Sequence, residues 1–417
     1  MEKIKELGYK ILNRIWILLR WMLLGGGCGV LIGIIAGLFG RSITIVSNFR
    51  IAHPWMLYLL PISGILIVYL YKFDKYNTNT NLVIDGIQKG SYVPLRMAPL
   101  IAISTILTHT CGGSAGREGA ALQLGGSIGG TIGKYLKLEE ADKKIMIMIG
   151  MSAAFSALFG TPLTATIFSI EVISVGIMQY AALVPCAFAA LAAKDVAEWI
   201  GCEGEHFFIP SYIDFSFINA SKIIFLAFLC AFISILFCNF LHDIEHSFHR
   251  VEDKRIRILI GSVLIILLSK VFNTTDYLGT GMSIIEKAVE GETVPLAFLL
   301  KIAFTAITLG CGFKGGEIVP SLFVGATFGC LFGQILHLSP ALCAACGMVA
   351  IFCGMTNCPI SSLFLSFELF GFDCMPFFLM AIGVSYLESG YFGLYNSQKI
   401  MYSKTELHFI NKKANEH

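Results

Sequence analysis

Charged residues are scarce in this chain. Asp, Glu, Lys and Arg make up 14% of its 417 residues, whereas a soluble domain contains about one quarter. Hydrophobic residues make up 56%, more than a soluble fold of this length can bury. The composition therefore excludes a soluble globular protein and indicates one that crosses the membrane several times. A large positive charge is also absent, and the net charge of +2 argues against nucleic acid as a partner.

Two further features are missing. The chain lacks the alternation of apolar and polar residues that is typical of barrel strands, which leaves α-helices as the spanning element. No small-residue cleavage site follows the apolar run from about Ile15 to Phe39, so we expect a retained first helix and not a signal peptide. Basic residues near both ends predict cytoplasmic termini and an even number of crossings. They are Lys3, Lys5, Lys10 and Arg14 at one end, and Lys399, Lys404, Lys412 and Lys413 at the other.

Cysteine is not scarce, since the chain has 13. Most of these residues lie in apolar stretches, where a thiol behaves as a small hydrophobic group. We therefore expect no disulfide framework. The C-x-x-C spacing of Cys343 and Cys346 lies in a small-residue helix, where it favours helix packing over redox chemistry.

Fourteen apolar segments are present, and several are shorter than the roughly 20 residues of a full membrane span. This predicts an all-α polytopic membrane protein with many tilted or half-spanning helices. We interpret residues 1–417 as one integral membrane transport domain without a cytosolic regulatory domain. The segments lie at about 15–39, 55–71, 93–109, 119–133, 143–159, 161–177, 180–200, 221–241, 256–272, 296–311, 319–337, 340–355, 358–371 and 374–394.

Two glycine-rich stretches, Gly112–Ala120 and Gly312–Pro320, each place a glutamate within apolar sequence. They match at an offset of 200 residues. A matched pair of this kind predicts an inverted repeat, with a transport site built from two half-helices where the repeats meet. The matching glycines are Gly112, Gly116, Gly125, Gly129 and Gly133 in one half, and Gly312, Gly316, Gly325, Gly329 and Gly333 in the other.

A second match supports two repeats at about 15–200 and 221–396. The stretches that begin at Gly150 and Gly347 are similar at an offset of 197. Pro162 lies twelve residues after Gly150, and Pro359 lies twelve residues after Gly347. Glu171 and Glu368 follow these prolines after nine residues. Because the glutamates are duplicated, we favour a shared structural role for them, such as bonding to open helix ends, over a proton route.

The segments Gly116–Gly119 (G-R-E-G) and Gly316–Pro320 (G-E-I-V-P) resemble signature motifs of the CLC family of anion channels and anion/proton antiporters. Three departures from the commoner chloride pattern resemble the fluoride-specific branch of that family. Asn77–Leu82 stands where G-S-G-I-P is expected, Ala120 replaces a proline, and Glu317 replaces an apolar residue. The resemblance implies a fluoride/proton antiporter that exports fluoride across the plasma membrane, and a homodimer with one pathway per subunit.

Glu118 begins a helix that opens with glycines, so its carboxylate is attracted to the same N–H groups that bind an anion. When ionised, the side chain occupies the position of the anion; when protonated, it loses its charge and leaves. We therefore expect a proton-linked gate. The alternative is a simple helix cap held by Arg117.

Glu317 is expected to carry a proton and to donate a hydrogen bond to the anion, since an ionised carboxylate would repel it. Fluoride is small and strongly hydrated, so its dehydration requires strong donors. The expected anion-binding residues are Asn79, Gly316, Glu317, Ile318, Val319 and Tyr395. Three of these side chains have an alternative role: Glu317 as a cap of its own helix, Asn79 as part of an asparagine turn, and Tyr395 as an interfacial aromatic residue. Commoner antiporters of the family carry an inner proton-transfer glutamate, and no motif of this sequence selects Glu203 or Glu205 for that role.

Two other functions stay open. Within the family, the chain is alternatively a chloride/proton antiporter or a passive anion channel. From another class, His242, Glu245 and His246 match the H-x-x-E-H spacing of some zinc peptidases. The surrounding run is charged, so a hydrated loop that binds no metal explains the same residues. We expect no cofactor and no metal.

Overall fold

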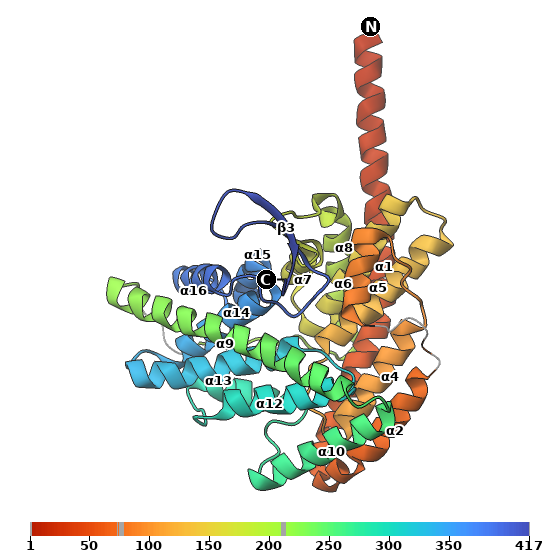
Figure 1. The fold of residues 1–417 in the computed structure, drawn as a ribbon. Coiled ribbons are helices and arrows are strands. Elements are labelled where there is room, and N and C mark those ends of the chain that lie inside the picture. Colours follow the sequence, from red (N-terminus) through yellow and green to blue (C-terminus); the bar gives the residue numbers. More distant parts are fainter. Residues whose placement is uncertain (1, 73, 75–78, 210–213, 417) are drawn as a thin grey trace.

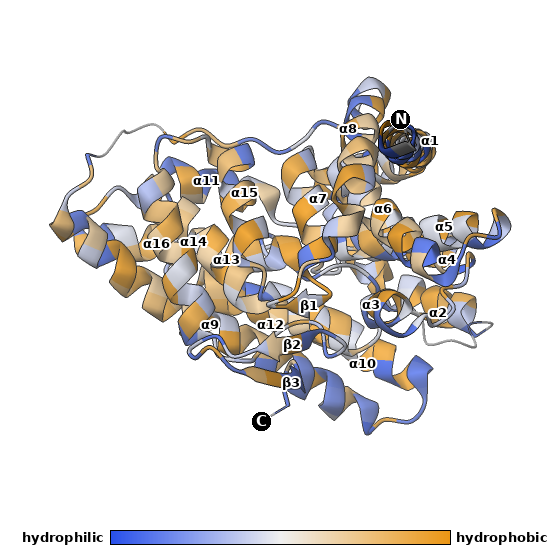
Figure 2. Cartoon of the chain, turned by 90° about the horizontal axis from the view of Figure 1, so that it is seen from above, coloured by the Kyte–Doolittle hydropathy of each residue, from blue (hydrophilic) through white to orange (hydrophobic). Residues whose placement is uncertain are grey.

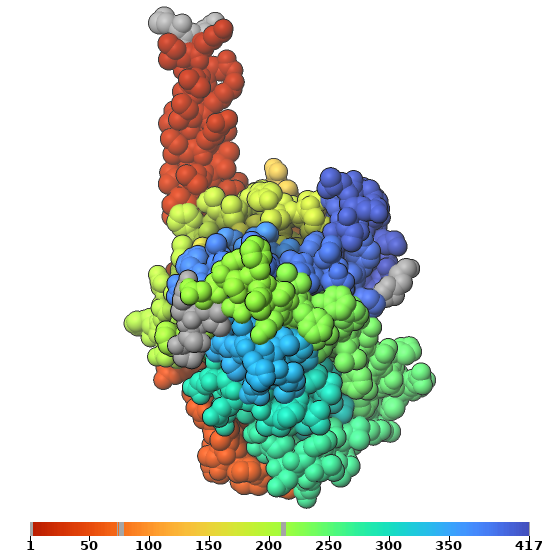
Figure 3. Space-filling view, turned by 90° about the vertical axis from the view of Figure 1, so that its left-hand side faces the viewer, coloured from red at the N-terminus to blue at the C-terminus, as the bar shows by residue number. Residues whose placement is uncertain are grey.

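The computed structural model describes residues 2–72, 74, 79–209 and 214–416. Long helices surround a buried centre, and the N-terminal part of the first helix projects from the body (Figure 1, Figure 3). Most helical segments are coloured as hydrophobic, and hydrophilic stretches occur at helix ends and in several connections (Figure 2). This distribution fits a protein whose helices face lipid.

The first half of the described chain contains eight α-helices and two short 3-10 helices. They are α1 (Glu2–Ala52), η1 (Pro54–Leu59), α2 (Leu60–Tyr71), α3 (Thr80–Lys89), α4 (Met97–Thr110), α5 (Glu118–Tyr135), α6 (Glu140–Phe159), α7 (Pro162–Glu171), η2 (Tyr180–Ala182) and α8 (Leu183–Ile200).

The second half contains eight more α-helices. They are α9 (Phe217–His249), α10 (Lys254–Val271), α11 (Met282–Glu290), α12 (Ala297–Gly310), α13 (Ile318–Leu336), α14 (Pro340–Thr356), α15 (Pro359–Phe370) and α16 (Met375–Glu388). Five helical segments of the described chain are long and apolar enough to cross a membrane, and five other apolar helices have 10–17 residues. The expected mixture of long and short helices is therefore confirmed.

Several sequence predictions were wrong in detail. The first helix is continuous over 51 residues and does not stop near Phe39, and α9 extends to His249 through the expected hydrated loop. The amphipathic helices α3 and α11 were missed because they are short and only partly apolar. A small sheet was also missed, in which β1 (Ser174–Val175) pairs in parallel with β2 (Lys399–Tyr402), and β2 pairs in antiparallel with β3 (Phe409–Lys413). All thirteen cysteines are buried and free.

The two halves meet through equivalent residues in opposite orientation. Gly116 N–H donates to Gly316 O (2.6 Å), and Gly316 N–H donates to Gly116 O (2.8 Å), which makes an antiparallel bridge. Around it, Ser114 N–H donates to the Thr308 hydroxyl at 3.0 Å. The equivalent residues at the offset of 200 form the same bond in the opposite direction: Lys314 N–H donates to the Thr108 hydroxyl at 3.3 Å. Equivalent residues that exchange bonds in antiparallel are related by a local two-fold axis, as an inverted repeat requires.

Glycines set the close approach of helices within each half. A Cβ on Gly125 of α5 would lie 2.0 Å from Gly150 O of α6, and a Cβ on Gly325 of α13 would lie 2.4 Å from Gly347 O of α14. No larger side chain fits at either contact, and small residues are what such interfaces require.

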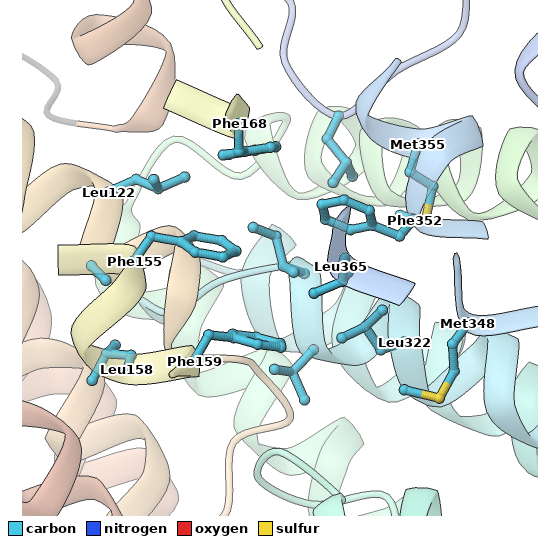
Figure 4. Packing of buried hydrophobic residues seen from close by; sticks show 14 of the residues in the cluster. Leu122, Phe155, Leu158, Phe159, Phe168, Leu322, Met348, Phe352, Met355 and Leu365 are labelled. Atoms are coloured by element: carbon cyan, nitrogen blue, oxygen red, sulfur yellow. The ribbon is translucent and has the colours of Figure 1, made fainter. Parts of the chain in front are cut away.

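The buried core contains the same duplication. Phe155 stacks on Phe168 with ring centroids 5.4 Å apart, and Phe168 contacts Phe352 at 5.9 Å. Phe155 and Phe352 are equivalent residues at the offset of 197. Figure 4 shows these rings packed together with Leu158 and Met355, another equivalent pair. The centre of the molecule is therefore an apolar contact between the two halves.

The expected structural role of Glu171 and Glu368 is confirmed. Glu171 of α7 accepts hydrogen bonds from Ile360 N–H (3.0 Å) and Ser361 N–H (2.8 Å) at the start of α15. Glu368 of α15 accepts bonds from Leu163 N–H (2.9 Å) and Thr164 N–H (2.8 Å) at the start of α7. Each carboxylate satisfies the open N–H groups of the other half's helix.

We predict that Glu368→Gln destabilises the protein by about 2 kcal/mol, because an amide replaces a carboxylate that accepts charge-assisted bonds. A lower melting temperature in detergent would measure this loss, with anion turnover per folded molecule unchanged. Glu388→Gln, at an exposed site on α16, is the matched control. A normal melting temperature for Glu368→Gln would contradict the capping role.

Candidate anion site

The first turns of α5 and α13 meet at the Gly116–Gly316 bridge. A Cβ on Gly316 would lie 2.5 Å from Gly119 N, and a Cβ on Gly119 would lie 2.9 Å from Gly316 Cα. Only glycines permit this approach. The first N–H groups of each helix have no partner within the helix and form the positive end of its dipole. The positive ends of two helix dipoles therefore lie close together at the bridge.

Glu118 is fully buried at the start of α5, with 0% exposure. Its Oε2 accepts a hydrogen bond from Arg117 N–H at 3.0 Å, and its Oε1 lies 3.3 Å from Arg117 Nε. The Glu118 carboxylate therefore lies on backbone N–H at the start of α5, where the gate hypothesis places an anion. The cap hypothesis requires contact between Glu118 and Arg117, and the gate hypothesis requires that two helix ends meet. The structure shows both features.

Arg117 does not depend on Glu118 alone. Its Nη2 donates to Leu158 O at 3.1 Å and to Glu205 Oε1 at 3.0 Å. Because Leu158 and Glu205 hold the guanidinium, Glu118 can leave without stranding a buried cation.

Glu317 and Tyr395 line one cavity of about 140 Å³, which we call the Glu317 cavity. Tyr395 is 2% exposed. Neither its hydroxyl nor Glu317 Oε2 has a hydrogen-bond partner among the described residues. Buried polar groups without partners are rare and cost about 1–3 kcal/mol each. Two of them on one small cavity indicate a place for a ligand that can satisfy both.

Asn79 also lines the Glu317 cavity, but its amide oxygen is already used. That oxygen accepts a hydrogen bond from Leu82 N–H at 3.1 Å and caps α3. Only the amide nitrogen is left to face an anion. Asn79 is thus a helix cap, and the predicted turn of Asn77, Asn79 and Asn81 stays untested because Asn77 lies outside the described residues.

The expected donors at the start of α13 divide into two groups. The Gly316 N–H donates to Gly116 O at 2.8 Å, so this group is already used in the bridge, and the anion-binding assignment of Gly316 stays a prediction. Ile318 and Val319 begin α13 and are buried. Their N–H groups have no acceptor four residues earlier within the helix, so they stay candidate donors.

The sequence did not single out Gln123, which is 5% exposed and lines the Glu317 cavity. Its Nε2 donates to the Thr80 hydroxyl at 3.1 Å, and its Oε1 has no partner among the described residues. A polar residue five positions after Glu118 on a glycine-rich helix was the available signal.

A second cavity of about 360 Å³, the Lys254 cavity, shares lining residues with the first, including Asn79, Glu245 and Lys314. Its other basic residues are His249, Lys254 and Arg257, and its other acid is Asp74. Basic side chains outnumber acids on its wall, so its field favours an anion.

A third cavity of about 470 Å³, the Arg117 cavity, has no lining residue in common with the other two. Arg117, Glu205 and Val319 line it together with the end of α1. Glu205 therefore lies on the Arg117 side of the bridge, away from Glu317. Arg117 and Glu317, which each follow one glycine of the bridge, thus line separate cavities. Glu118 is buried beside the bridge and lines neither of them.

The comparisons with known proteins agree with this geometry. Residues 63–390 match the family model described as voltage gated chloride channel. The chain belongs to this family. It is 32% identical to the chloride/fluoride channel protein of Pseudomonas syringae pv. tomato, over 92% of this chain and 87% of that protein. It is 28% identical to the H(+)/Cl(-) exchange transporter ClcA of Vibrio cholerae, over 61% of this chain and 58% of that one.

Among solved structures, the chain resembles a CLC-type fluoride/proton antiporter, with a TM-score of 0.87 and 32% identity over 92% of this chain and 98% of that one. A slow cyanobacterial Cl-/H+ antiporter shares the fold, with a TM-score of 0.78 at 19% identity. The expected family and the expected membrane fold are confirmed.

The residues of the H-x-x-E-H spacing do not converge on one metal position in the structure. His242 and Glu245 lie on α9 and line the Glu317 cavity, whereas His246 is exposed. Over the described ranges, no group of three His, Cys, Asp or Glu side chains is placed to hold a metal ion. Membership of a channel and transporter family favours transport over the zinc-peptidase alternative.

Proposed function

We propose that this protein is a fluoride/proton antiporter that exports fluoride from the cytoplasm, with the halves at about 15–200 and 221–396 acting as one transport domain. The observation that carries the proposal is the position of Glu118, whose buried carboxylate lies on backbone N–H at the meeting point of two helix ends. A protonated Glu118 loses its attraction to that point and leaves it to an anion. One side chain then links the movement of protons to the movement of anions.

Glu317 supports fluoride as the anion. A protonated Glu317 and the Tyr395 hydroxyl each offer an O–H donor to the cavity that they share, and neither Glu317 Oε2 nor the Tyr395 oxygen has a partner among the described residues. Fluoride is a small acceptor that requires short, strong donors to replace its water. The N–H groups of Ile318 and Val319 and the Asn79 amide complete the proposed set.

The proposed orientation follows the positive charges. We place both termini in the cytoplasm of a plasma-membrane protein, because basic residues flank the first and last helices. The Arg117 cavity lies at the carboxyl end of α1. In this orientation it opens to the outside of the cell, and the Lys254 and Glu317 cavities supply the anion from the cytoplasm. The homodimer implied by the family resemblance is also part of the proposal, and crosslinking in the membrane tests it.

Flux in reconstituted vesicles tests this function directly. A fluoride gradient is expected to drive protons in the opposite direction, and chloride should substitute poorly. Chloride-driven proton movement of similar rate would identify a chloride/proton antiporter, and fluoride flux without proton movement would identify a passive channel.

Glu118→Gln is expected to abolish coupled exchange, because the amide can neither carry the proton nor compete as an anion. We expect proton counterflow to fall by about a hundredfold or more. Vesicles with the exposed Glu140→Gln variant serve as the control. Normal exchange by Glu118→Gln would refute the gate.

Glu317→Ala is expected to raise the half-saturating fluoride concentration by about tenfold or more, since a hydrogen bond to a charged group contributes about 1.5–3 kcal/mol. Its melting temperature should change much less than its fluoride affinity. Glu252→Ala, in the exposed turn after α9, is the comparison variant. Unchanged fluoride flux in Glu317→Ala would make Glu317 a structural cap.

A further inference from the structure

The Arg117 cavity contains a second arginine that nothing above has used. Arg50 belongs to the last turn of α1 and lines this cavity. Its side chain is close to the Gly279 loop, with Nη2 at 3.5 Å from the position of a Cβ on Gly279. Gly279 N–H donates to Gly113 O at 3.1 Å, so this loop lies directly on the first glycine motif.

Arg50 is buried, with 9% exposure, and it lacks a counter-charge. Its Nε has no hydrogen-bond partner among the described residues, and no ion pair within the described chain includes it. Other arginines differ: Arg117 contacts Glu118 and Glu205, and Arg41 of the same helix donates to Ile200 O at 2.7 Å. A buried cation without a partner is strongly unfavourable, so a mobile anion is the expected counter-charge.

The surroundings of Arg50 add positive potential. Lys301 is fully buried beside the same loop, and its Nζ donates to Gly279 O at 2.7 Å and to Tyr277 O at 3.2 Å. Helix α11 begins at the cavity wall with Gly281 as its N-cap, and the hydroxyl residues Thr280 and Ser283 line the cavity. Helix N–H groups and hydroxyls are donors that bind small anions.

Three acids share this cavity, namely Glu205, Asp276 and Glu286. Glu205 already pairs with Arg117. Asp276 and Glu286 are exposed, so water and salt screen them, whereas the buried Arg50 is screened much less. The buried part of the wall is therefore positive, and the exposed acids weaken its attraction without cancelling it.

We propose that the Arg117 cavity holds a small inorganic anion on Arg50, as a binding station between Glu118 and the solution on that side of the membrane. The transported anion occupies this station before or after it passes Glu118. This inference rests on the proposed function for the identity of that anion, which is fluoride if the exchange is fluoride/proton and chloride otherwise.

The test measures KM and maximal rate in vesicles for the anion that the wild-type protein transports. Arg50→Gln is expected to raise the KM of that anion about tenfold, the loss expected when one charge-assisted bond is removed, with a smaller effect on the maximal rate. Arg50→Lys keeps the charge and should restore most of the affinity. Arg41→Gln, a matched arginine on the same helix, should leave KM unchanged.

A second variant moves KM in the opposite direction and does not depend on a buried residue. Glu286→Gln removes an exposed acid from the cavity wall, so it is expected to lower KM by about twofold, with the largest effect at low ionic strength. This variant keeps the proposal testable if Arg50→Gln does not fold.

The outcomes separate this inference from the proposed function. Wild-type exchange with no change of KM in Arg50→Gln and Glu286→Gln overturns the anion station and leaves the antiporter intact. A raised KM in Arg50→Gln supports the station whichever anion is carried and whether or not protons are coupled. Equal KM changes in Arg50→Gln and Arg41→Gln would assign the effect to α1 stability and would also overturn it.

Discussion

The reciprocal hydrogen bonds between Gly116 and Gly316 are the interaction on which the rest of the structure depends. They bring the starts of α5 and α13 together without side chains between them, and they orient the two halves in opposite directions. Glu118, Glu317 and the N–H groups of Ile318 and Val319 lie within three residues of this contact in the sequence, whereas Asn79 and Tyr395 come from other parts of the chain. The glycines act as spacers, so the N–H groups and the carboxylates of their neighbours supply the chemistry.

Four buried or partly buried glutamates lie in the repeated segments, and their hydrogen bonds distinguish their roles. Glu171 and Glu368 are equivalent at the offset of 197, whereas Glu118 and Glu317 are one position apart at the offset of 200. Glu171 and Glu368 accept several bonds from the opposite half and are fully used in joining the repeats. Glu118 is bound to groups of its own helix start, and Glu317 keeps one oxygen without a partner among the described residues. A carboxylate that accepts several bonds across the two repeats stabilises the fold, whereas one held only at its own helix start, or with an oxygen left without a partner, is suited to proton and anion exchange.

The sequence predicted the features that repeat. Matched glycines gave the helix contact, and matched prolines and glutamates gave the reciprocal caps, because both patterns depend on spacing alone. Other features depend on tertiary structure. The hydrogen bond that occupies the Gly316 N–H could not be predicted, because its partner Gly116 lies 200 residues away in the sequence. Helix α11 and the C-terminal strands were missed because their apolar character is weak, and Arg50 gave no signal, since an unpaired cation is recognised only once its neighbours are known.

The central claim is that the ionised Glu118 carboxylate and the anion compete for the same helix ends. Calorimetric titration of the purified protein with fluoride at several pH values, in buffers of different ionisation enthalpy, tests this competition most directly. We expect fluoride to bind more tightly as the pH falls, and the protein to take up a proton with each bound anion. An affinity that does not change with pH, with no proton uptake on binding, would contradict it.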